Sequence, residues 1–463
     1  MTVRMRLGEV VNSGGRLDRL PLSSFHRRVV GLISAGGLLD TFDVYLAFGV
    51  VAALRAEEFS TLEQAAAFIS MTFLGMLIGS AIAGYVGDRF GRRFSYQFNL
   101  ALFGVASFAA ALAPNMLVLI VCRFVMGIGL GAELIVAAGT LGEFIPPAVR
   151  GRYASVMGLV SSSGLFVSTA VGYLVIPAFG WRAMFVIGGV GAIVVLLLRK
   201  QLPESPRWLE AVGRTEEAEQ TLQLIEARVQ AQAGPLPTAL PPVAAAPGNA
   251  PLSALFAPAL RPRLLAAVFV AVTVNMTVYG LVGWLPTFMV SHGAAVQKTL
   301  GLSTIMSIGS IAGSVLGVAL SDRIPRRRAL IAGGIGTLVF MTIYPLASGD
   351  QAIAASGFFL VLSIYFTTNQ GMYSYIPEIF PTALRLRGVG FAGMCARTAG
   401  MITPYAIVPL LAHFGLPGVL AMVGLVVVGM IAAVFSLKLE TRGAPLETIA
   451  QQDNPPGAHV DGV

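Results

Sequence analysis

Two aspartates inside a long apolar segment are the first residues that point to chemistry. Asp40 and Asp43 lie in the run LDTFDVY, and an i, i+3 spacing puts both carboxylates on one face of a helix. Two carboxylates held this close resist being ionised together, so one of them can take up a proton. The alternative is that one Asp pairs with Arg123 or caps a broken helix. We predict proton coupling through at least one of the two.

Arg123 and Glu133 are further candidates for proton coupling, because an ionisable side chain at membrane depth is costly and invites a functional interpretation. They are ten residues apart in one apolar run, roughly 15 Å along a helix axis, so they cannot pair with each other. Arg123 is a candidate partner for an Asp of the first span, or an attraction for an anion. Glu133 would be protonated if it faced lipid. A structural hydrogen bond and a transport role remain open for it.

The second half of the chain carries residues suited to binding a planar anion. Arg397 offers a bidentate guanidinium fork to a carboxylate, with a buried pair with Glu378 or another acid as the structural alternative. Tyr279 and Trp284 lie in the run NMTVYGLVGWLPTF, where their rings could stack on a planar ligand. Trp284 could instead be an interfacial belt residue.

One segment of the second half is denser in polar side chains than any other apolar run. Asn369 and Tyr373 share a face by i, i+4 spacing, and with Gln370 they are candidate substrate contacts. In the first half Phe166 stands just beyond the run Ser161–Ser163, which offers hydroxyl groups and no amide side chains. Because sugars need many amide contacts, these residues favour a small planar organic anion. The polar residues of the dense segment are Tyr365, Thr367, Asn369, Gln370 and Tyr373.

These residues must be positioned by helices that cross a membrane. Of 463 residues, 56% are hydrophobic and 12% are charged, against about 25% charged in a soluble domain. Many apolar runs reach the ~20 residues that a bilayer span needs. We predict an all-α polytopic membrane protein with spans near 29–54, 65–86, 96–113, 116–139, 153–176, 181–199, 263–290, 299–320, 328–347, 353–376, 388–411 and 416–438.

The twelve spans divide the chain into five parts. A cytoplasmic tail at 1–28 precedes a six-helix bundle at 29–199, a cytoplasmic central loop at 200–262, a second six-helix bundle at 263–438 and a cytoplasmic tail at 439–463. Of the 31 Lys and Arg residues, 26 fall on one side of this arrangement. That bias places both termini in the cytoplasm of a multi-pass cell-membrane protein.

The net charge of +8 does not indicate nucleic acid as a partner. The basic residues sit in short clusters between apolar runs, where they set topology, and no nucleic-acid motif accompanies them. Cys122 and Cys395 both lie in apolar runs, so we expect neither a disulfide nor a metal site.

Two charged patches six spans apart form an internal repeat. The first reads GYVGDRFGRR and the second LSDRIPRRR, and each suits an Asp that caps or bridges a helix end while the cations stay near lipid headgroups. Acids and arginines after spans 4 and 10 repeat in the same way. We predict an ion-pair network that closes the inner side of the molecule, with static helix capping as the alternative. The residues are Gly84, Asp88, Arg89, Arg92, Glu143, Arg150, Asp322, Arg323, Glu378, Arg385 and Arg387.

The first patch matches the loop signature G-x-x-x-D-R-x-G-R-R/K, and the chain resembles the major facilitator superfamily over essentially its whole length. The second patch departs from the signature, since Pro325 stands where Gly91 would pair. Four segments, RFVMGIGLGAE, EFIPPAVRG, LPESPRWL and PEIFPTALRLRG, resemble the sugar-porter-like branch. This resemblance implies secondary active transport by alternating access between two pseudosymmetric six-helix bundles.

Two elements narrow the resemblance further. LDTFDVY resembles the D-G-F-D element of aromatic-acid:proton symporters, with Thr41 in place of Gly. The pattern Y-G-L-x-x-W-x-P resembles nicotinate permeases and synaptic vesicle glycoprotein relatives. Together they imply proton-coupled import of a small planar organic anion, nicotinate first and benzoate-like acids second.

Other functions stay open or find little support in the residues. A sugar or polyol porter and a non-transporting membrane receptor or interaction protein are the alternatives. We expect a monomer without cofactor or metal, and not an enzyme, because no nucleophile–base set, metal cluster or nucleotide loop is present.

Overall fold

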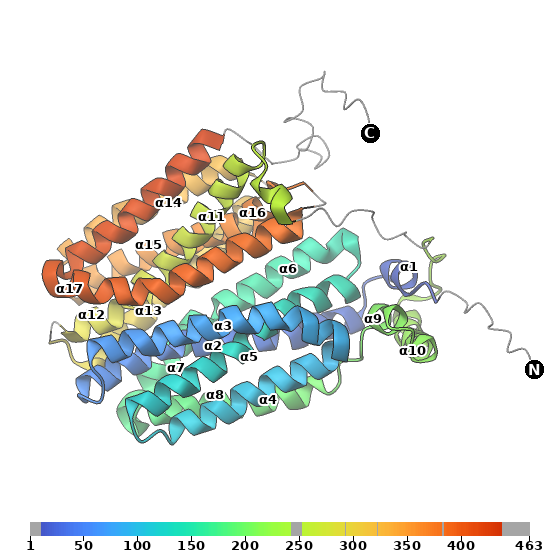
Figure 1. Ribbon diagram of the computed structural model, residues 1–463, viewed down its shortest axis with the longest axis horizontal. Coiled ribbons are helices and arrows are strands. Elements are labelled where there is room, and N and C mark those ends of the chain that lie inside the picture. Colours follow the sequence, from blue (N-terminus) through green and yellow to red (C-terminus); the bar gives the residue numbers. More distant parts are fainter. Residues whose placement is uncertain (1–10, 242–251, 292, 322, 382–383, 438–463) are drawn as a thin grey trace, which may run out of the picture.

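The computed structural model describes residues 11–241, 252–291, 293–321, 323–381 and 384–437. Within these ranges, eleven helices are long and apolar enough to cross a membrane, and they run side by side (Figure 1). The last of them is broken at Gly415, whose φ of 63° and ψ of −161° are not helical, so it makes two spans. Each predicted span overlaps one of these helices, and the twelve-helix fold is confirmed.

The first six spans are unbroken helices apart from the fifth, which is interrupted at Ser163. The pair α6 and α7 makes this fifth span. The helices are α2 (Ser24–Ala56), α3 (Leu62–Phe90), α4 (Arg92–Ala111), α5 (Met116–Phe144), α6 (Pro147–Ser162), α7 (Gly164–Phe179) and α8 (Arg182–Arg199).

The second six spans contain two wider, π-helical stretches, η2 in the seventh span and η4 in the tenth. A short 3-10 helix, η1 (Leu252–Phe256), precedes them. The elements are α11 (Arg261–Asn275), η2 (Met276–Val282), α12 (Leu285–Ser291), α13 (Val296–Ser321), α14 (Arg326–Ile343), η3 (Tyr344–Leu346), α15 (Asp350–Thr368), η4 (Asn369–Tyr375), α16 (Ile376–Glu378) and α17 (Arg385–Leu437).

Glycines hold α3 and α5 in close contact. A Cβ atom on Gly75 would lie 2.2 Å from the carbonyl oxygen of Phe124, and one on Gly127 would lie 2.3 Å from that of Thr72. Real Cβ atoms do not approach this closely, so only glycine fits at these positions. Small residues at a helix contact are how helices pack in lipid, where no hydrophobic force drives them together.

The second bundle repeats this contact between α13 and α15. A Cβ atom on Gly309 would lie 2.4 Å from the carbonyl oxygen of Phe358, and one on Gly313 would lie 2.2 Å from that of Leu362. Spans 2 and 4 of the first bundle therefore correspond to spans 8 and 10 of the second. The internal repeat of the sequence is thus also a repeat of helix packing.

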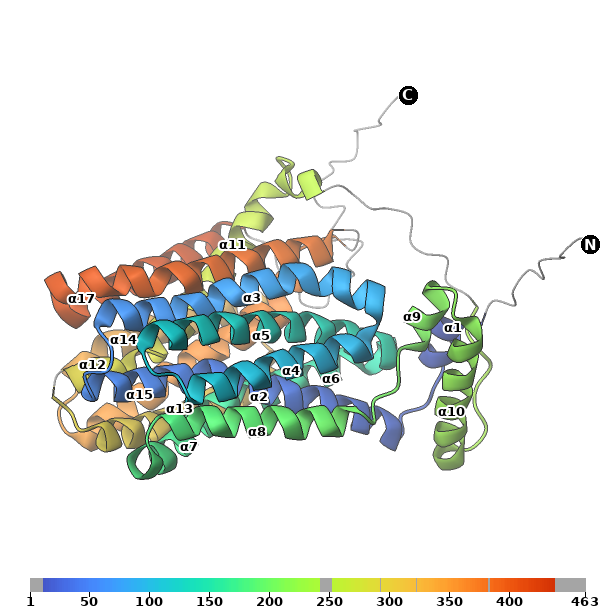
Figure 2. The same cartoon turned by 60° about the horizontal axis from the view of Figure 1, so that its bottom comes forward.

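The two bundles meet along one long interface. α3 packs on α17, α7 on α13, and α2 on α12. Figure 2 shows the helices of both bundles running in the same general direction, with α9 and α10 beyond one end. We call this the α10 end, and the opposite one the far end.

A cap of short helices lies beyond the α10 end (Figures 1 and 2). It consists of α1 (Ser13–Asp18), α9 (Pro206–Ala211) and α10 (Thr215–Ala233). Arg16 of α1 contacts Glu219 at 2.6 Å and Glu226 at 2.7 Å, and Arg19 contacts Glu226 at 2.6 Å. These pairs attach the N-terminal segment to α10.

Arg16 lowers the pKa of both glutamates that it contacts. Its hydrogen bond lowers the pKa of Glu219. Partial burial acts to raise the pKa of Glu226, but hydrogen bonds from Arg16 and Arg19 outweigh it, and the pKa is lowered. Both glutamates are therefore charged at neutral pH.

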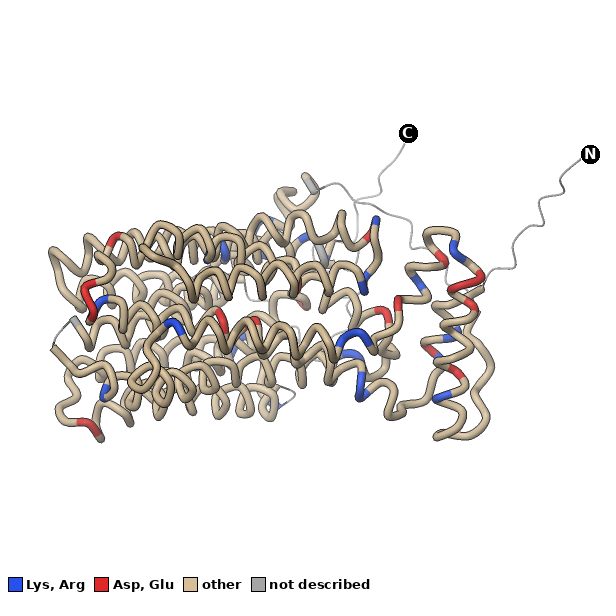
Figure 3. The backbone as a smooth tube through the Cα atoms, turned by 90° about the horizontal axis from the view of Figure 1, so that it is seen from below, with Lys and Arg blue, Asp and Glu red and all other residues tan. Residues whose placement is uncertain are grey.

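Charge is sparse between the two ends of the bundles. Figure 3 shows that most of the chain between the ends is free of Lys, Arg, Asp and Glu, with a few charged positions at mid-depth. Those few positions are the ones that need an explanation.

We predict that Gly127→Val destabilises the protein by about 1 to 3 kcal/mol, as overpacking of a close contact does. The matched control is Gly139→Val on the same helix, since no atom lies within 4 Å of a Cβ there. Thermal unfolding of both variants in detergent checks this. Equal melting temperatures would contradict the close α3–α5 contact.

We predict that Arg16→Gln loosens α1 from α10 by about 1 kcal/mol, the value of a partly exposed ion pair. Because the folded-state pKa of Glu219 and Glu226 lies below the ordinary value of 4.5, this stabilisation is present above that pH and is lost as the pH falls through the lowered values. Hydrogen exchange of α1 and α10 amides measures it.

The control for the cap is Arg214→Gln, which removes an exposed pair with Glu217 within α10. It should leave the protection of α1 unchanged. If both variants exchange like the wild type at neutral pH, the ion pairs do not hold α1 in place.

Candidate functional site

One π-helical segment, η2, lies in the middle of span 7, and the other, η4, lies in the last third of span 10. η2 carries Tyr279, and η4 carries Asn369, Gln370 and Tyr373. π turns are rare and are frequent at functional sites. The structure therefore distorts the helix at both places where the sequence predicts substrate contacts.

A cluster of tyrosines joins the two bundles at this level. Tyr45 of α2 shares a hydrogen bond with Tyr365 of α15. The ring of Tyr279 stacks on that of Tyr45, with centroids 5.7 Å apart, and the ring of Phe73 meets Tyr279 edge-on at 5.0 Å. Tyr45 was not predicted as a site residue, although it stands only two residues beyond Asp43. We call these four residues the tyrosine cluster.

A small cavity lies at the bundle interface beside Tyr45. It is lined by α2, α7, α8, α12, α13, α15 and the end of η2, with Ser168, Thr169, Ser303 and Ser307 as its hydroxyl groups. Its volume is about 30 Å³, close to the share of one water molecule in the liquid. It cannot hold an organic ligand in this conformation.

Arg397 and Tyr373 lie near the tyrosine cluster. Arg397 is half-buried on α17, interacts electrostatically with Tyr279, and has no hydrogen-bond partner for its Nε atom. Tyr373 is 47% exposed, and its ring lies 3.3 Å from where a Cβ atom on Gly158 of the first bundle would be. Phe166 is half-buried on α7.

Asn369 and Tyr373, which the sequence predicts on one face, have different surroundings in the structure. Asn369 is buried and packs against Gly317 of α13, whereas Tyr373 is exposed and faces the first bundle. Gln370 is buried and its Nε2 donates a hydrogen bond to the carbonyl of Gly317 at 2.7 Å, so its amide nitrogen is engaged within the second bundle.

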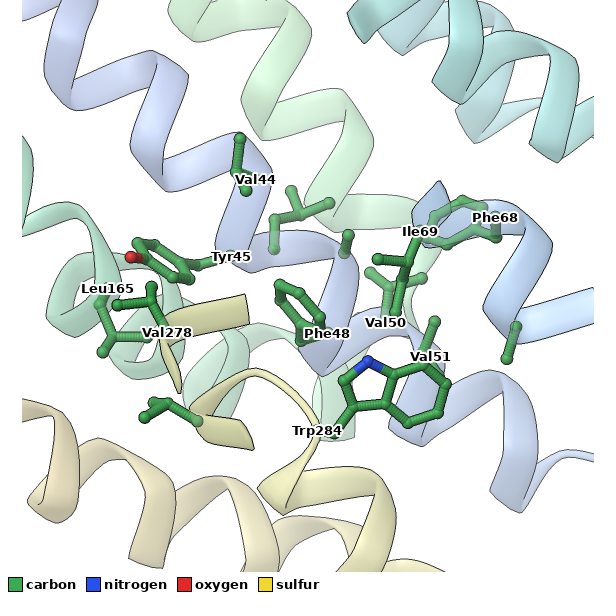
Figure 4. Close-up of a cluster of buried hydrophobic side chains, with 14 of the residues drawn as sticks. Val44, Tyr45, Phe48, Val50, Val51, Phe68, Ile69, Leu165, Val278 and Trp284 are labelled. Carbon is green, nitrogen blue, oxygen red and sulfur yellow. The ribbon is translucent and has the colours of Figure 1, made fainter. Parts of the chain in front are cut away.

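Trp284 is fully buried, so it is not at a membrane surface in this conformation. Its ring stacks on Phe288, with centroids 6.2 Å apart. Figure 4 shows it beside Val51 of α2, in the same apolar cluster as Phe48. Because a Cβ on Gly283 would lie 2.6 Å from the Phe48 ring, glycine at this position lets α2 and α12 approach.

The first bundle contains a buried ion pair between spans 1 and 4. Arg123 Nη1 donates to Asp43 Oδ2 at 2.6 Å, and its Nε donates to the hydroxyl of Thr72 at 3.1 Å. Both charged side chains are at most 1% exposed. The structure thus pairs Arg123 with an Asp of the first span, as the sequence suggested.

A second buried ion pair was not predicted. Glu133 of α5 pairs with Arg199 at the end of α8, and each residue is 2% exposed. Glu133 therefore faces protein and not lipid. Arg199, the last residue of the predicted sixth span, is drawn into the bundle. A basic residue after an apolar run is typical of a headgroup contact, so no sequence signal marks it.

Asp40 lies between these pairs without joining either. It is half-buried, it interacts electrostatically with Glu133, Arg199 and Asp43, and among the described residues no hydrogen bond or ion pair engages its carboxylate. Such a group is able to exchange a proton.

The motif residues of the first bundle form pairs at the α10 end. Arg92 contacts Glu143 at 2.8 Å and the exposed Asp88 at 3.1 Å. Arg150 lies 3.9 Å from Asp18 and does not pair with Glu143. Arg89 donates to the hydroxyl of Tyr85, and Gly84 has open space around it.

In the second bundle, Glu378 pairs with Arg326 at 3.4 Å, and this pair is the counterpart of Arg92 with Glu143. Asp322 lies outside the described residues; Arg323, Arg385 and Arg387 lie at the same end of their helices. The Arg92 pairs thus lie within the first bundle, and the Arg326–Glu378 pair lies within the second. The part of the chain that the structure describes holds no group of three His, Cys, Asp or Glu residues that could bind a metal.

Comparisons with known proteins agree with this architecture. Residues 32–452 match the family model described as sugar (and other) transporter. The inner membrane metabolite transport protein YdjE of Escherichia coli (strain K12) is 34% identical over 95% of this chain and 98% of its own length. The niacin transporter NiaP of Acinetobacter baylyi is 30% identical over 94% of this chain and 98% of its own length.

The fold also matches a solved structure. The xylose transporter XylE from E. coli, in a partially occluded inward-open conformation, aligns with a TM-score of 0.72 at 20% identity, over 91% of this chain and 100% of that chain. A second structure of XylE, described as a proton:xylose symporter of the major facilitator superfamily, aligns with a TM-score of 0.68 at 21% identity, over 93% of this chain and 99% of that chain, so the chain has the major facilitator fold. The chain belongs to the sugar (and other) transporter family, and it is a multi-pass membrane transporter and not an enzyme.

Proposed function

We propose that the chain imports a small planar organic anion by alternating access, with nicotinate as the first candidate and benzoate-like acids as the second. One observation carries the proposal: Arg397 is a half-buried guanidinium beside an aromatic cluster, and no carboxylate of the described residues pairs with it. A partly desolvated cation without a counter-ion favours an anionic ligand.

The aromatic surroundings of Arg397 favour a planar anion over a flexible one. Tyr279 and Tyr373 come from the two π-helical segments, and rings of this kind bind planar ligands by stacking or edge contacts. A guanidinium fork matches a carboxylate bidentately. The name of one relative, a niacin transporter, supports a pyridine carboxylate as the first substrate to test.

A sugar or polyol is the second candidate, because the family model covers sugar transporters. The amides weigh against it. Both side chains, Asn369 and Gln370, are buried, and Gln370 Nε2 donates to the carbonyl of Gly317, so neither amide is exposed to a sugar hydroxyl in this conformation. Competition of hexoses for uptake distinguishes the two candidates.

Alternating access requires that one end of the site closes while the other opens. Three contacts close the far end here: the tyrosine cluster, α2 on α12, and α7 on α13. At the α10 end, Arg92–Glu143 and Arg326–Glu378 each stay within one bundle. This arrangement supports access to the site from the α10 end.

The orientation and the energy source complete the proposal. The clustering of Lys and Arg on the loops of the α10 end favours a cytoplasmic position for that end and for both termini. Asp40 and Asp43 at mid-depth favour proton coupling. We propose a monomer, in which each chain holds a complete path between its two bundles.

We predict that Arg397→Gln weakens nicotinate binding by ~10- to 100-fold, since a hydrogen bond to a charged group contributes about 1.5 to 3 kcal/mol. Arg397→Lys keeps the charge but not the fork, so it should restore only part of the affinity. Thermal stabilisation by nicotinate, measured beside nicotinamide, detects the loss.

The control for this experiment is Arg261→Gln, an exposed arginine at the start of α11. It should bind nicotinate like the wild type. Stabilisation by glucose but not by nicotinate would sink the anion proposal, and equal stabilisation by nicotinamide would remove the role of the carboxylate.

We predict that Tyr365→Phe opens the far end more often, because it removes a hydrogen bond between the bundles that contributes about 1 kcal/mol. A cysteine introduced at Ser303, in the small cavity, should then react about 5-fold faster with a membrane-impermeant thiol reagent, in a background that lacks Cys122 and Cys395. Tyr344→Phe, a buried tyrosine outside the cluster, is the control. Equal rates in both variants would show that the bond does not close the far end.

A further inference from the structure

The five charged groups held between α2, α5 and α8 in the first bundle do not balance. They are Asp40, Asp43 and Glu133 against Arg123 and Arg199, three carboxylates against two guanidinium groups. If all five are ionised, the buried cluster carries one net negative charge. An uncompensated charge in an apolar interior is costly, and a carboxylate in such a place takes a proton instead.

The contacts show which carboxylate is left over. Asp43 has Arg123 at 2.6 Å. Glu133 has Arg199, and both are 2% exposed. Asp40 has no guanidinium within 4 Å among the described residues, yet it interacts electrostatically with Glu133, Arg199 and Asp43.

Arg199 is fixed in place by α2. It donates to the carbonyl oxygens of Leu32 at 3.1 Å and Ile33 at 3.2 Å, and its guanidinium lies 4.2 Å from the centre of the Tyr96 ring. A Cβ atom on Gly36 would lie 1.8 Å from Arg199 Nη2. Gly36 is one helical turn before Asp40, so this glycine lets the guanidinium lie against α2 and pair with Glu133.

Unpartnered oxygen atoms mark the same cluster. Asp43 Oδ1 and Glu133 Oε2 are both buried without a hydrogen-bond partner. Each carboxylate therefore uses one oxygen on its arginine and keeps the other available. When Asp40 is protonated, its hydroxyl is a hydrogen-bond donor, and Asp43 Oδ1 and Glu133 Oε2 are acceptors without a partner in the same cluster.

Among the described residues, Asp40 has three charged neighbours and no others from the helices packed on α2. The electrostatic partners are Glu133 of α5, Arg199 of α8 and Asp43 of its own helix. α6 and α7 contact its neighbourhood with Ser161, near Gly37, and with Gly164, near Thr41. α12 and α13 meet α2 farther along, around Phe48 and Gly49.

We propose that this cluster binds one proton, that Asp40 holds it, and that Arg199 and Glu133 act as a positioning pair that keeps Asp40 without a partner. The step is simple: a proton adds to the Asp40 carboxylate and the cluster becomes neutral. The proton leaves by the same half-buried side chain, while Asp43 and Glu133 stay paired. The role of this site in transport rests on the proposed function; the proton site itself does not.

Counting charge gives a sharp test. Asp40→Asn leaves two acids and two arginines, so no proton is bound. Arg199→Gln leaves three acids and one arginine, so two protons are bound. The double variant Glu133→Gln, Arg199→Gln removes one charge of each sign and returns the cluster to one proton.

The measurement is infrared spectroscopy of the purified full chain in nanodiscs, titrated with pH, which detects the carbonyl stretch of protonated carboxylic acids. We expect one such acid in the wild type at neutral pH, none in Asp40→Asn, two in Arg199→Gln and one in the double variant. Glu217→Gln on the exposed face of α10 is the control and should match the wild type.

Two results would overturn the proposal: a signal that persists in Asp40→Asn, or a double variant that differs from the wild type. Asp40 makes no hydrogen bond to the described residues, so the Asp40→Asn variant should fold. If Arg199→Gln fails to fold, the number of protons bound by the double variant still tests the proposal.

Proteoliposome uptake adds the transport arm. If the wild type takes up nicotinate, a proton gradient should stimulate the wild type and the double variant but not Asp40→Asn. If no anion is transported, the proposed function fails, while the infrared result still tests the proton site.

Discussion

A charge at membrane depth must find a partner, and this constraint organises the first bundle. Arg123 joins α5 to α2 through Asp43, and Arg199 joins α8 to both α2 and α5 through two carbonyl groups and Glu133. These contacts tie three helices together with groups that insertion into lipid would otherwise penalise. The pairs hold the bundle as one body, and they also leave Asp40 as the group that can change its charge.

The two bundles repeat each other in helix packing but not in chemistry. Close glycine contacts join α3 to α5 and α13 to α15, so the backbone plan is the same. The first bundle carries the cluster of three carboxylates and two arginines, whereas Arg397 of the second lies beside aromatic rings. The proposed proton site and the proposed anion site thus lie in different bundles. Tyr45, two residues beyond Asp43, connects them through its bond to Tyr365.

The sequence predicted what depends on local pattern. Span positions follow from apolar length, and the pair of Arg123 with an Asp of span 1 follows from the cost of isolated charge. The rest depends on partners far along the chain. Arg199 resembles a headgroup contact until Glu133 is seen beside it, and Asn369 and Tyr373 differ in their surroundings because one meets α13 and the other meets the first bundle. Spacing within one helix does not show which neighbouring helix each side chain meets.

The two π-helical segments fall on the helices of the second bundle that correspond to the charged helices of the first. Spans 1 and 4 of the first bundle are the unbroken helices α2 and α5, and they carry four of the five charged groups of the cluster. Their counterparts in the second bundle are spans 7 and 10, which carry η2 and η4. A π turn packs less well than an α turn and persists where surrounding contacts hold it. Rigid helices suit the side that must keep ion pairs at fixed distances, because a small shift would leave a charge unpaired. Deformable helices suit the bundle that must close around a ligand. The two bundles thus share one helix arrangement but have different proposed roles, one holding the ion pairs and the other binding the anion.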